Sequence, residues 1–266
     1  MTELADSVES AEQLTSVWRH MVLDRTPDAD VRDLPGVAVR WADSRFAFWN
    51  CLTLTGTGIG PDALARRLRE AAEVMRTKQR PGFLWLFEAL LDETARAALP
   101  IAAEQAGLRY AFPGTGMAGD VLPLPEPRHP DLTFVRVTDE TQLRAYADLN
   151  SRAYGFPLED GRDGLLGSTL WKDGVYAYLG MRGDTPVACA GAVAEDGRLF
   201  VALVATDPEW QRKGYGEAVT RKALYEGARA TGLTRAVLHA TEAGAPVYRR
   251  IGLRPNSPIL FYGLQD

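Results

Sequence analysis

A glycine-bearing loop before a predicted helix is the part of the sequence best suited to chemistry. The loop reads Gln211-Arg-Lys-Gly-Tyr-Gly216 and follows the apolar run Leu199 to Ala205. The first N–H groups of a helix have no partner within it, and the helix dipole favours negative charge there. Glycine lets the main chain approach a phosphate, and Arg212 and Lys213 add positive charge. The pattern favours an anion-binding loop; the alternative is a glycine pair that only ends a strand or relieves crowding.

The elements around this loop form a regular series in the C-terminal half. Apolar runs predict strands at residues 132–137, 175–181, 187–193, 199–205, 236–240 and 259–264. Helices are predicted from Thr138 or Asp139 onward, and at residues 216–230 and 243–251. Turn residues at 182–185 and 195–198 join three of the strands into an antiparallel meander. We therefore expect the loop to lie between a meander strand and a helix.

Two motifs, in the same order along the chain, resemble those of the GNAT N-acetyltransferases. Gln211–Gly216 is similar to the family's Q/R-x-x-G-x-G/A motif, and Tyr248-Arg-Arg-Ile-Gly-Leu253 resembles its Y-x-x-x-G-F segment. The resemblance covers residues 132–266, and departs from the family at Leu253, usually phenylalanine, and at Thr241, often asparagine. It implies an α/β fold with a mixed sheet (α+β), the GNAT acyl-CoA N-acyltransferase fold.

The same resemblance implies an acetyl-CoA site made largely of main-chain groups. Residues 203–205 would bond the pantetheine arm, and amides of residues 212–216 would bind the pyrophosphate. Thr241 would orient the tyrosine of the second motif, or the cosubstrate, through its hydroxyl. The expected cofactor-binding residues are Leu203, Val204, Ala205, Gln211, Arg212, Lys213, Gly214, Tyr215, Gly216 and Thr241.

Tyr248 is the catalytic residue that the resemblance implies. A phenol with a pKa of about 10 can give a proton to the departing CoA thiolate at neutral pH. An uncharged amine would attack the thioester carbonyl directly, while a main-chain N–H of the splayed fourth strand polarises its oxygen. The base that takes the ammonium proton stays open between His239, Glu242 and an ordered water, and for His239 a packing role is favoured.

The acceptor site is expected between Gly155 and Gly174 and its surroundings, where aromatic side chains could form pocket walls. Those candidates are Tyr154, Phe156 and Trp171, and the alternative for each is hydrophobic core. Three acidic residues, Glu159, Asp160 and Asp163, could favour a cationic acceptor, although a solvated loop is the favoured interpretation. The sequence therefore leaves the amine unidentified.

The N-terminal half also alternates strands and helices. Strands are predicted at residues 45–53, 83–87 and 117–122, and helices at residues 61–75 and 93–106. Trp49-Asn50, Phe83-Leu-Trp85 and the stretch from Gly107-Leu108 to Met117 together resemble the degenerate leading domain of certain tandem GNAT proteins. Thr55–Gly60 lacks the Walker lysine and the acidic partner of a dinucleotide site, which favours a plain turn. We expect this half to be structural, covering the acceptor site or forming a homodimer face.

Length and composition set the remaining bounds. A chain of 266 residues favours two domains, and four prolines between Val121 and Pro130 predict an extended connector, so the boundaries are placed at 1–125 and 126–266. A formal net charge of -5 argues against a nucleic-acid partner. No apolar run approaches the roughly 20 residues that cross a bilayer, and the first ten residues lack a secretory signal pattern, so no membrane partner and a cytoplasmic location are expected.

Cysteine and histidine usage completes these bounds. Cys51 and Cys189 lie in apolar runs and favour buried thiols over a disulfide or a zinc site, and the three histidines show no ligand spacing, so no metal is expected. The function expected is transfer of the acetyl group of acetyl-CoA to a primary amine of a small molecule or peptide. The alternatives are a non-catalytic acyl-CoA-binding regulator, and an acyltransferase with a longer acyl donor or with a hydroxyl or thiol acceptor.

Overall fold

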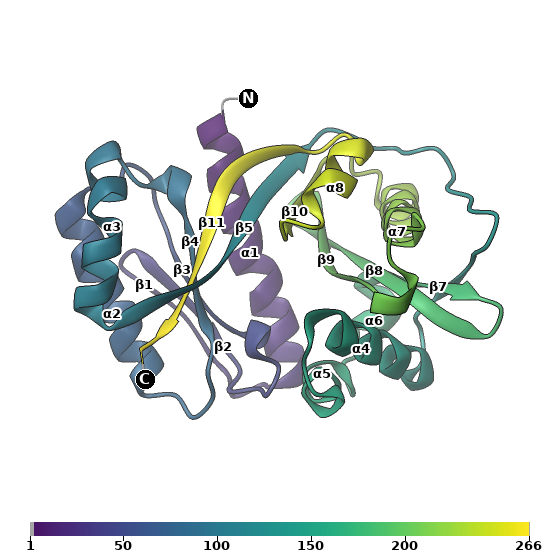
Figure 1. Cartoon of the computed structure of the whole chain (residues 1–266), viewed down its shortest axis with the longest axis horizontal. Helices are drawn as coiled ribbons and strands as arrows, with labels where there is room; N and C mark the ends of the chain where they lie inside the picture. The colour runs from purple at the N-terminus through teal and green to yellow at the C-terminus, as the bar shows by residue number, and fades with distance from the viewer. Residues whose placement is uncertain (1–2, 266) are drawn as a thin grey trace. The chain divides into compact units, whose positions relative to one another are not determined.

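The computed structural model describes residues 3–265 and divides into two compact units (Figure 1). Unit 1 comprises Met1–Met117, Ala240–Ala243 and Pro255–Asp266, and unit 2 comprises Ala118–His239 and Gly244–Arg254. The end of the chain thus groups with the first unit, although the sequence analysis assigned it to the second domain. A domain boundary at residue 125 stays a prediction.

Unit 2 contains a mixed sheet with the strand order β10-β9-β8-β7-β6. The strands β6 (Thr133–Arg136), β7 (Val175–Arg182), β8 (Thr185–Glu195) and β9 (Arg198–Thr206) pair antiparallel in succession, and β10 (Ala236–Ala240) pairs parallel with β9. Tight turns at Gly183 and at Asp196-Gly197 adopt positive φ values, as hairpin turns require. The predicted antiparallel meander is confirmed.

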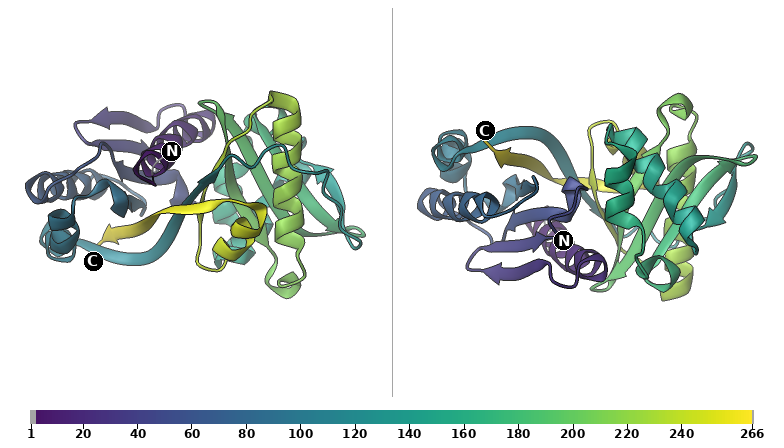
Figure 2. Two further views of the ribbon diagram at one scale, coloured as in Figure 1. Left: turned by 90° about the horizontal axis from the view of Figure 1, so that it is seen from above. Right: turned by 90° about the horizontal axis from the view of Figure 1, so that it is seen from below.

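Helices cover both faces of this sheet, as the two opposite views of Figure 2 show. On one face, α7 (Tyr215–Thr231) packs Tyr215 and Val219 against small side chains of β8, including Ala188 and Ala190. On the other face lies α4 (Glu140–Tyr154), which begins at a capping box formed by Asp139 and Gln142. Because side chains alternate along a strand, β8 offers alternate residues to the two helices.

Three short helices complete unit 2: α5 (Leu158–Leu165), α6 (Leu170–Asp173) and α8 (Ala245–Ile251). The sequence predicted α8 but not α5 or α6, because α5 contains two glycines and α6 has only four residues. These elements leave too little helical periodicity to be distinguished from loop.

Unit 1 repeats the order of strands and helix seen in unit 2. Its elements are α1 (Glu3–Arg25), β1 (Asp30–Leu34), β2 (Val37–Trp41), η1 (Ala47–Trp49), β3 (Asn50–Leu54), α2 (Pro61–Arg76), β4 (Phe83–Phe87), η2 (Glu88–Leu90), α3 (Glu93–Ala106), β5 (Leu108–Gly119) and β11 (Arg254–Leu264). The strand order is β1-β2-β3-β4-β11-β5. The strands β1, β2 and β3 are antiparallel, and β4 is parallel to β3 after α2, just as β10 is parallel to β9 after α7. The mixed α/β fold is therefore confirmed, and the GNAT-like character of the first unit stays a prediction.

Several features of unit 1 differ from the sequence prediction. The strand predicted at residues 117–122 is β5, which runs from Leu108 to Gly119; Pro113 and two nearby glycines had hidden its extended pattern. The helix α1 and the hairpin β1–β2 were not predicted. The core explains α1, because Trp18 packs edge-on against Trp49 and Trp85, with ring centroids 5.3 and 5.5 Å away. Those contacts are long-range, so local periodicity does not show them.

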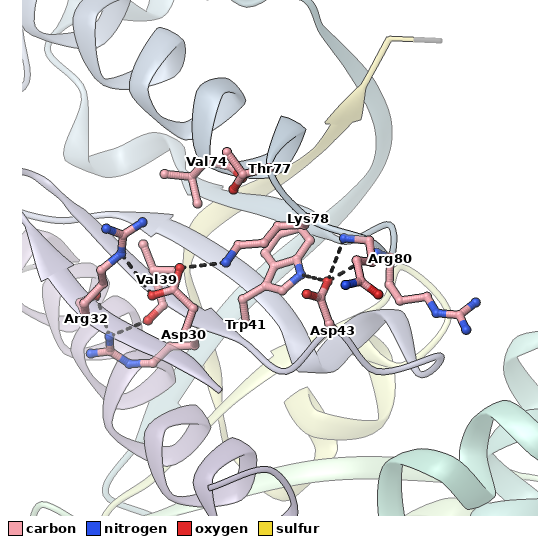
Figure 3. Close-up of polar contacts among 11 residues, drawn as sticks. Asp30, Arg32, Val39, Trp41, Asp43, Val74, Thr77, Lys78 and Arg80 are labelled. Carbon is pink, nitrogen blue, oxygen red and sulfur yellow. Dashed lines mark hydrogen bonds and ion pairs between the residues drawn. The ribbon is translucent and has the colours of Figure 1, made fainter. Parts of the chain in front are cut away.

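A polar network joins the end of α2 to the hairpin β1–β2 (Figure 3). Asp30 accepts from Arg32 Nε at 2.9 Å and from Lys78 Nζ at 2.7 Å. Asp43, in the left-handed region at φ 52°, accepts through Oδ1 from Trp41 Nε1 at 2.9 Å and from the main-chain N–H groups of residues 79 and 80 at 3.1 and 3.2 Å. These contacts fix the loop that leads into β4.

In the described range 3–265, none of the helices is both long enough and apolar enough to cross a membrane.

Candidate functional site

The loop after β9 leaves a helix N-terminus open. A short 3-10 turn, η3 (Pro208–Trp210), follows β9 and is capped by Asp207, whose side chain accepts from the Glu209 N–H. Residues 211–214 are exposed, and α7 begins at Tyr215 with Gly214 as an N-cap that makes no side-chain hydrogen bond. The N-cap residue therefore offers no side-chain acceptor to the first N–H groups of α7, which suits a phosphate site.

The two glycines of the loop are required for different physical reasons. Gly214 has φ 79°, in the left-handed region that strains other residues. Gly216 has no such angle, but a Cβ atom there would lie 2.7 Å from Thr206 Oγ1 at the end of β9. Gly216 thus lets the helix start close to the strand. The geometry at Gly216 is what relief of crowding also requires, so the two glycines fit both interpretations, and anion binding by the loop stays a prediction.

Cationic and aromatic side chains surround the loop. Arg182 Cζ and Lys213 Nζ lie over the Trp210 ring, at 4.7 and 4.4 Å from its centroid. His129 Nε2 lies 3.1 Å from the Lys213 carbonyl oxygen, and its ring packs edge-on against Tyr215. Arg182 and His129 were not predicted as site residues, because both are distant in sequence from the loop and belong to no motif.

The strand before the loop separates from its neighbour and bulges. The pairing of β10 with β9 ends at Val201, whereas β9 continues to Thr206. On the other side, Ala202 pairs with Gly191 and Ala205 with Cys189, so two residues of β9 oppose one residue of β8. Leu203 in this bulge has φ 52°. A bulge re-aims main-chain groups, and here it does so where the edge facing β10 is open.

The carbonyl groups of the bulge are held from α4. The hydroxyl of Tyr146 donates to the Leu203 oxygen at 2.8 Å, and Tyr154 donates to the Val204 oxygen at 3.0 Å. The residues predicted to bond the pantetheine arm therefore have two of their carbonyls engaged. We expect their N–H groups to be the more available ones.

Tyr248 lies on α8 and is buried, with 8% of its surface exposed. Burial raises the pKa of Tyr248 well above its usual range, and the nearby Tyr154 raises it further. The phenol is therefore protonated at neutral pH, as a proton donor must be. Its role as general acid stays a prediction.

An ion-pair network fixes α8 to the start of α7. The Glu217 carboxylate, in the first turn of α7, forms ion pairs with Arg250 Nε of α8 at 2.7 Å and with Arg221 Nη2 at 2.9 Å. Burial alone would raise the pKa of Glu217, but the hydrogen bonds from Arg250 and Arg221 outweigh it and lower the pKa. The loop and Tyr248 are thus carried by elements joined through charged groups.

The remaining candidates fall into three groups. His239 is half-buried and packs edge-on against Phe200 with centroids 5.1 Å apart, which fits the favoured packing role. Trp171 is buried against Tyr146 and therefore belongs to the core. The exposed residues Thr241 and Glu242 belong to the segment grouped with unit 1, and their roles stay predictions.

The acceptor region includes further predicted residues. Phe156 lies beside Tyr154, with ring centroids 6.4 Å apart. Glu159 and Asp163 are exposed and Asp160 is half-buried, as a solvated segment would be. Cys51 and Cys189 are buried thiols, as predicted. Over residues 3–265, no group of three or more His, Cys, Asp or Glu side chains could hold a metal ion.

Comparisons with known proteins address the family and the fold. The model of the acetyltransferase (GNAT) family matches residues 143–253. A GCN5-related N-acetyltransferase from Kribbella flavida has a similar structure, with a TM-score of 0.70, 19% identity, and coverage of 97% of this chain and 96% of that chain. Another GCN5-related N-acetyltransferase, from Sphaerobacter thermophilus, has a similar structure with a TM-score of 0.61 and 16% identity, and the match covers 98% of this chain and 92% of that chain.

A tandem GNAT protein from the clavulanic acid biosynthesis pathway also has a similar fold, with a TM-score of 0.52, 14% identity, and coverage of 73% of this chain and 67% of that chain. Comparison with curated protein sequences gave no match. At these identities the structures establish the fold, and the family rests on the matched sequence model. The chain therefore contains, over residues 143–253, a domain of the acetyltransferase (GNAT) family.

Proposed function

We propose that the protein transfers the acetyl group of acetyl-CoA to a primary amine of a small molecule or peptide. Family membership supports acyl transfer in general. The observation that carries the finer proposal is the open N-terminus of α7 at the end of the bulged strand β9. One end of this arrangement suits a pyrophosphate, and the other offers main-chain donors to the amide and thioester groups of the cosubstrate.

The residues present fit a CoA thioester. The absence of a Cβ at Gly216 leaves a close approach between helix and strand, and Arg212, Lys213 and Arg182 supply positive charge around the loop. The main-chain amide groups of residues 212–216 would bind the pyrophosphate. Gln211 is the first residue of this loop. The main chain of residues 203–205 would bind the pantetheine arm, through N–H groups in particular.

The reaction needs one nucleophile and one proton donor. The uncharged amine nitrogen forms a bond to the thioester carbon, and the carbon–sulfur bond then breaks. The thiolate takes a proton from the Tyr248 hydroxyl, and the new amide nitrogen loses one to a base. Tyr248 suits its part because its raised pKa keeps the proton available across the physiological range.

Turnover with a panel of primary amines tests the proposal, with release of the CoA thiol as the signal. We expect acetyl-CoA to support turnover with at least one amine. Tyr248→Phe should lower kcat by about 100-fold or more, since a general acid typically contributes about 100- to 10,000-fold, with little change in acetyl-CoA affinity. Tyr225→Phe on α7 is the matched control and should retain activity.

Three results would count against the proposal. Acetyl-CoA binding without turnover on any amine would favour a regulatory protein. Turnover only with longer acyl-CoA donors would show that the acyl donor is not acetyl-CoA. An unchanged kcat in Tyr248→Phe would remove Tyr248 from the mechanism.

A further inference from the structure

Three polar side chains of α4 lie along one stripe of the helix and contact consecutive carbonyl groups of β9. Tyr146, Asn150 and Tyr154 are spaced four residues apart, so they share a face. The Tyr146 hydroxyl donates to the Leu203 oxygen at 2.8 Å and lies 3.3 Å from the Ala202 oxygen. Asn150 Nδ2 also donates to the Leu203 oxygen, at 3.2 Å. The Leu203 carbonyl is thus held by these two side chains of α4, and the Cys189 thiol of β8 also contacts it at 3.8 Å.

These two side chains are fully buried, which limits their other roles. Tyr146 and Asn150 are both 0% exposed, so neither offers a surface for a ligand. Asn150 Nδ2 also donates to the Tyr146 carbonyl, which fixes the amide against the helix itself. Gly191 on β8 leaves room for the hydroxyl, because a Cβ there would lie 3.2 Å from Tyr146 Oη. The contact is therefore built from two strands and a helix.

The geometry of a trans peptide turns this contact into an orientation. The C=O and N–H groups of one peptide unit lie in a plane and point in opposite directions. The Leu203 oxygen points toward α4, so the N–H of Val204, in the same peptide unit, points away from α4. Neither Leu203 nor Val204 has a register partner in β8. The φ of 52° at Leu203 lies in the left-handed region, so the backbone at this residue departs from the extended conformation of the strand.

We infer that Tyr146 and Asn150 are positioning residues that hold the Leu203–Val204 peptide with its N–H aimed at the thioester oxygen of the bound acyl-CoA. This inference rests on the proposed function. The side chains contact neither cosubstrate nor acceptor, and they act through one main-chain donor. Loss of a hydroxyl that fixes the peptide leaves the same amide present but less well oriented, so catalysis suffers more than binding.

Infrared difference spectroscopy of bound acetyl-CoA carrying carbon-13 at the thioester carbonyl tests the orientation directly. A hydrogen bond to the carbonyl oxygen lowers its stretching frequency. In the wild-type complex we expect the band below that of free acetyl-CoA, and in Tyr146→Phe we expect much of that shift to be lost. With an amine acceptor, kcat should fall about tenfold, the value of one hydrogen bond, while the acetyl-CoA Kd changes less than twofold.

Tyr178→Phe, on β7, is the matched control, because it removes a phenol hydroxyl of the same unit outside this contact. In the Tyr178→Phe complex, the thioester carbonyl band of bound acetyl-CoA and the kcat should match those of the wild type. Asn150→Ala provides a second variant if Tyr146→Phe does not fold. Hydrogen exchange of residues 202–205 in the ligand-free protein should be faster in either folded variant than in the control.

The outcomes separate the inference from the function on which it rests. A wild-type protein that does not bind acetyl-CoA contradicts the proposed function, and the inference fails with it. A wild type that binds, with a shifted band that Tyr146→Phe and Asn150→Ala leave unchanged, contradicts the inference alone. A rise in the acetyl-CoA Kd by the same factor as the fall in kcat also overturns it, because the side chains would then support binding rather than orientation.

Discussion

Tyr248 shows how burial at a single residue prepares a proton donor. Taking a phenol out of water penalises its charged form, so the pKa of Tyr248 lies well above that of a free tyrosine. The same burial makes the phenol a weaker acid, and it is suited to a thiolate leaving group only if the two are in direct contact. The hydroxyl is therefore expected to face the sulfur of the bound cosubstrate.

The pH profile tests this property of Tyr248. Because the donor stays protonated, kcat should show no alkaline loss due to Tyr248 below about pH 10, the ordinary tyrosine pKa. The measurement is kcat from pH 7 to pH 10 with saturating amine of low pKa. A decline with an apparent pKa of about 10 or lower, present in the wild type and absent in Tyr248→Phe, would show that burial does not keep the donor protonated.

At the scale of elements, Asp43 links the hairpin β1–β2 to the segment after α2. One carboxylate oxygen accepts three hydrogen bonds, and the residue occupies a left-handed conformation that asparagine and aspartate tolerate. Asp43→Ala should lower the free energy of unfolding by about 2 kcal/mol, through lost hydrogen bonds and backbone strain.

Asp43→Asn is the matched control, because it keeps an acceptor oxygen and tolerates the same backbone angle. Its unfolding midpoint in urea should stay close to the wild type. Equal midpoints for the alanine and asparagine variants at a reduced value would show that charge, and not the acceptor and the conformation, is what Asp43 provides.

Elements with strong local signals were predicted well, and those that depend on distant contacts were not. The loop and α7 were found because glycine, charge and helical periodicity coincide within twenty residues. The helix α3 was found within its observed bounds, because Asp92 caps it and Gly107 ends it in the left-handed conformation. By contrast, α1 is explained by Trp18 packing against residues more than thirty positions away.

The candidate site shows the same division. Gln211–Gly216 and Tyr248 were marked by motifs, but the hold of Tyr146 and Asn150 on Leu203 joins residues more than fifty positions apart in sequence. In sequence, Tyr146 could be recognised only as part of an apolar helix face. The pairing of β11 with β4 is another example, since a final apolar strand does not indicate which sheet it joins.

At the scale of the whole molecule, buried thiols and phenols make the fold sensitive to alkali. Burial raises the pKa of Cys51 and Cys189 and of Tyr146 and Tyr248, so these groups stay neutral in the folded protein. In the unfolded chain, cysteine ionises near pH 8.5 and tyrosine near pH 10. Stability is therefore complete below about pH 8.5 and falls as the pH rises further.

Urea unfolding at pH values from 7.5 to 10.5 tests this linkage. Each group that is ionised only in the unfolded state should lower the free energy of unfolding by about 1.4 kcal/mol per pH unit. In the double variant Cys51→Ala, Cys189→Ala, the decline should begin near pH 10 instead. A free energy of unfolding that is constant from pH 8.5 to 10.5, or an onset that the double variant does not move, would contradict the account.

The central claim is that the open N-terminus of α7 binds the pyrophosphate of acetyl-CoA. Calorimetric titration with acetyl-CoA tests it most directly, using Gly214→Glu beside Gly232→Glu. Both glycines cap α7 in the left-handed conformation, at φ 79° and 74°, so the two variants carry similar backbone strain at opposite ends of one helix.

Only Gly214→Glu places a carboxylate in the loop where the phosphates are expected. The account predicts that the wild type and Gly232→Glu bind acetyl-CoA, and that folded Gly214→Glu binds at least about 100-fold more weakly, since it loses the anion site. Equal affinity in all three proteins, or no binding to the wild type, would contradict it.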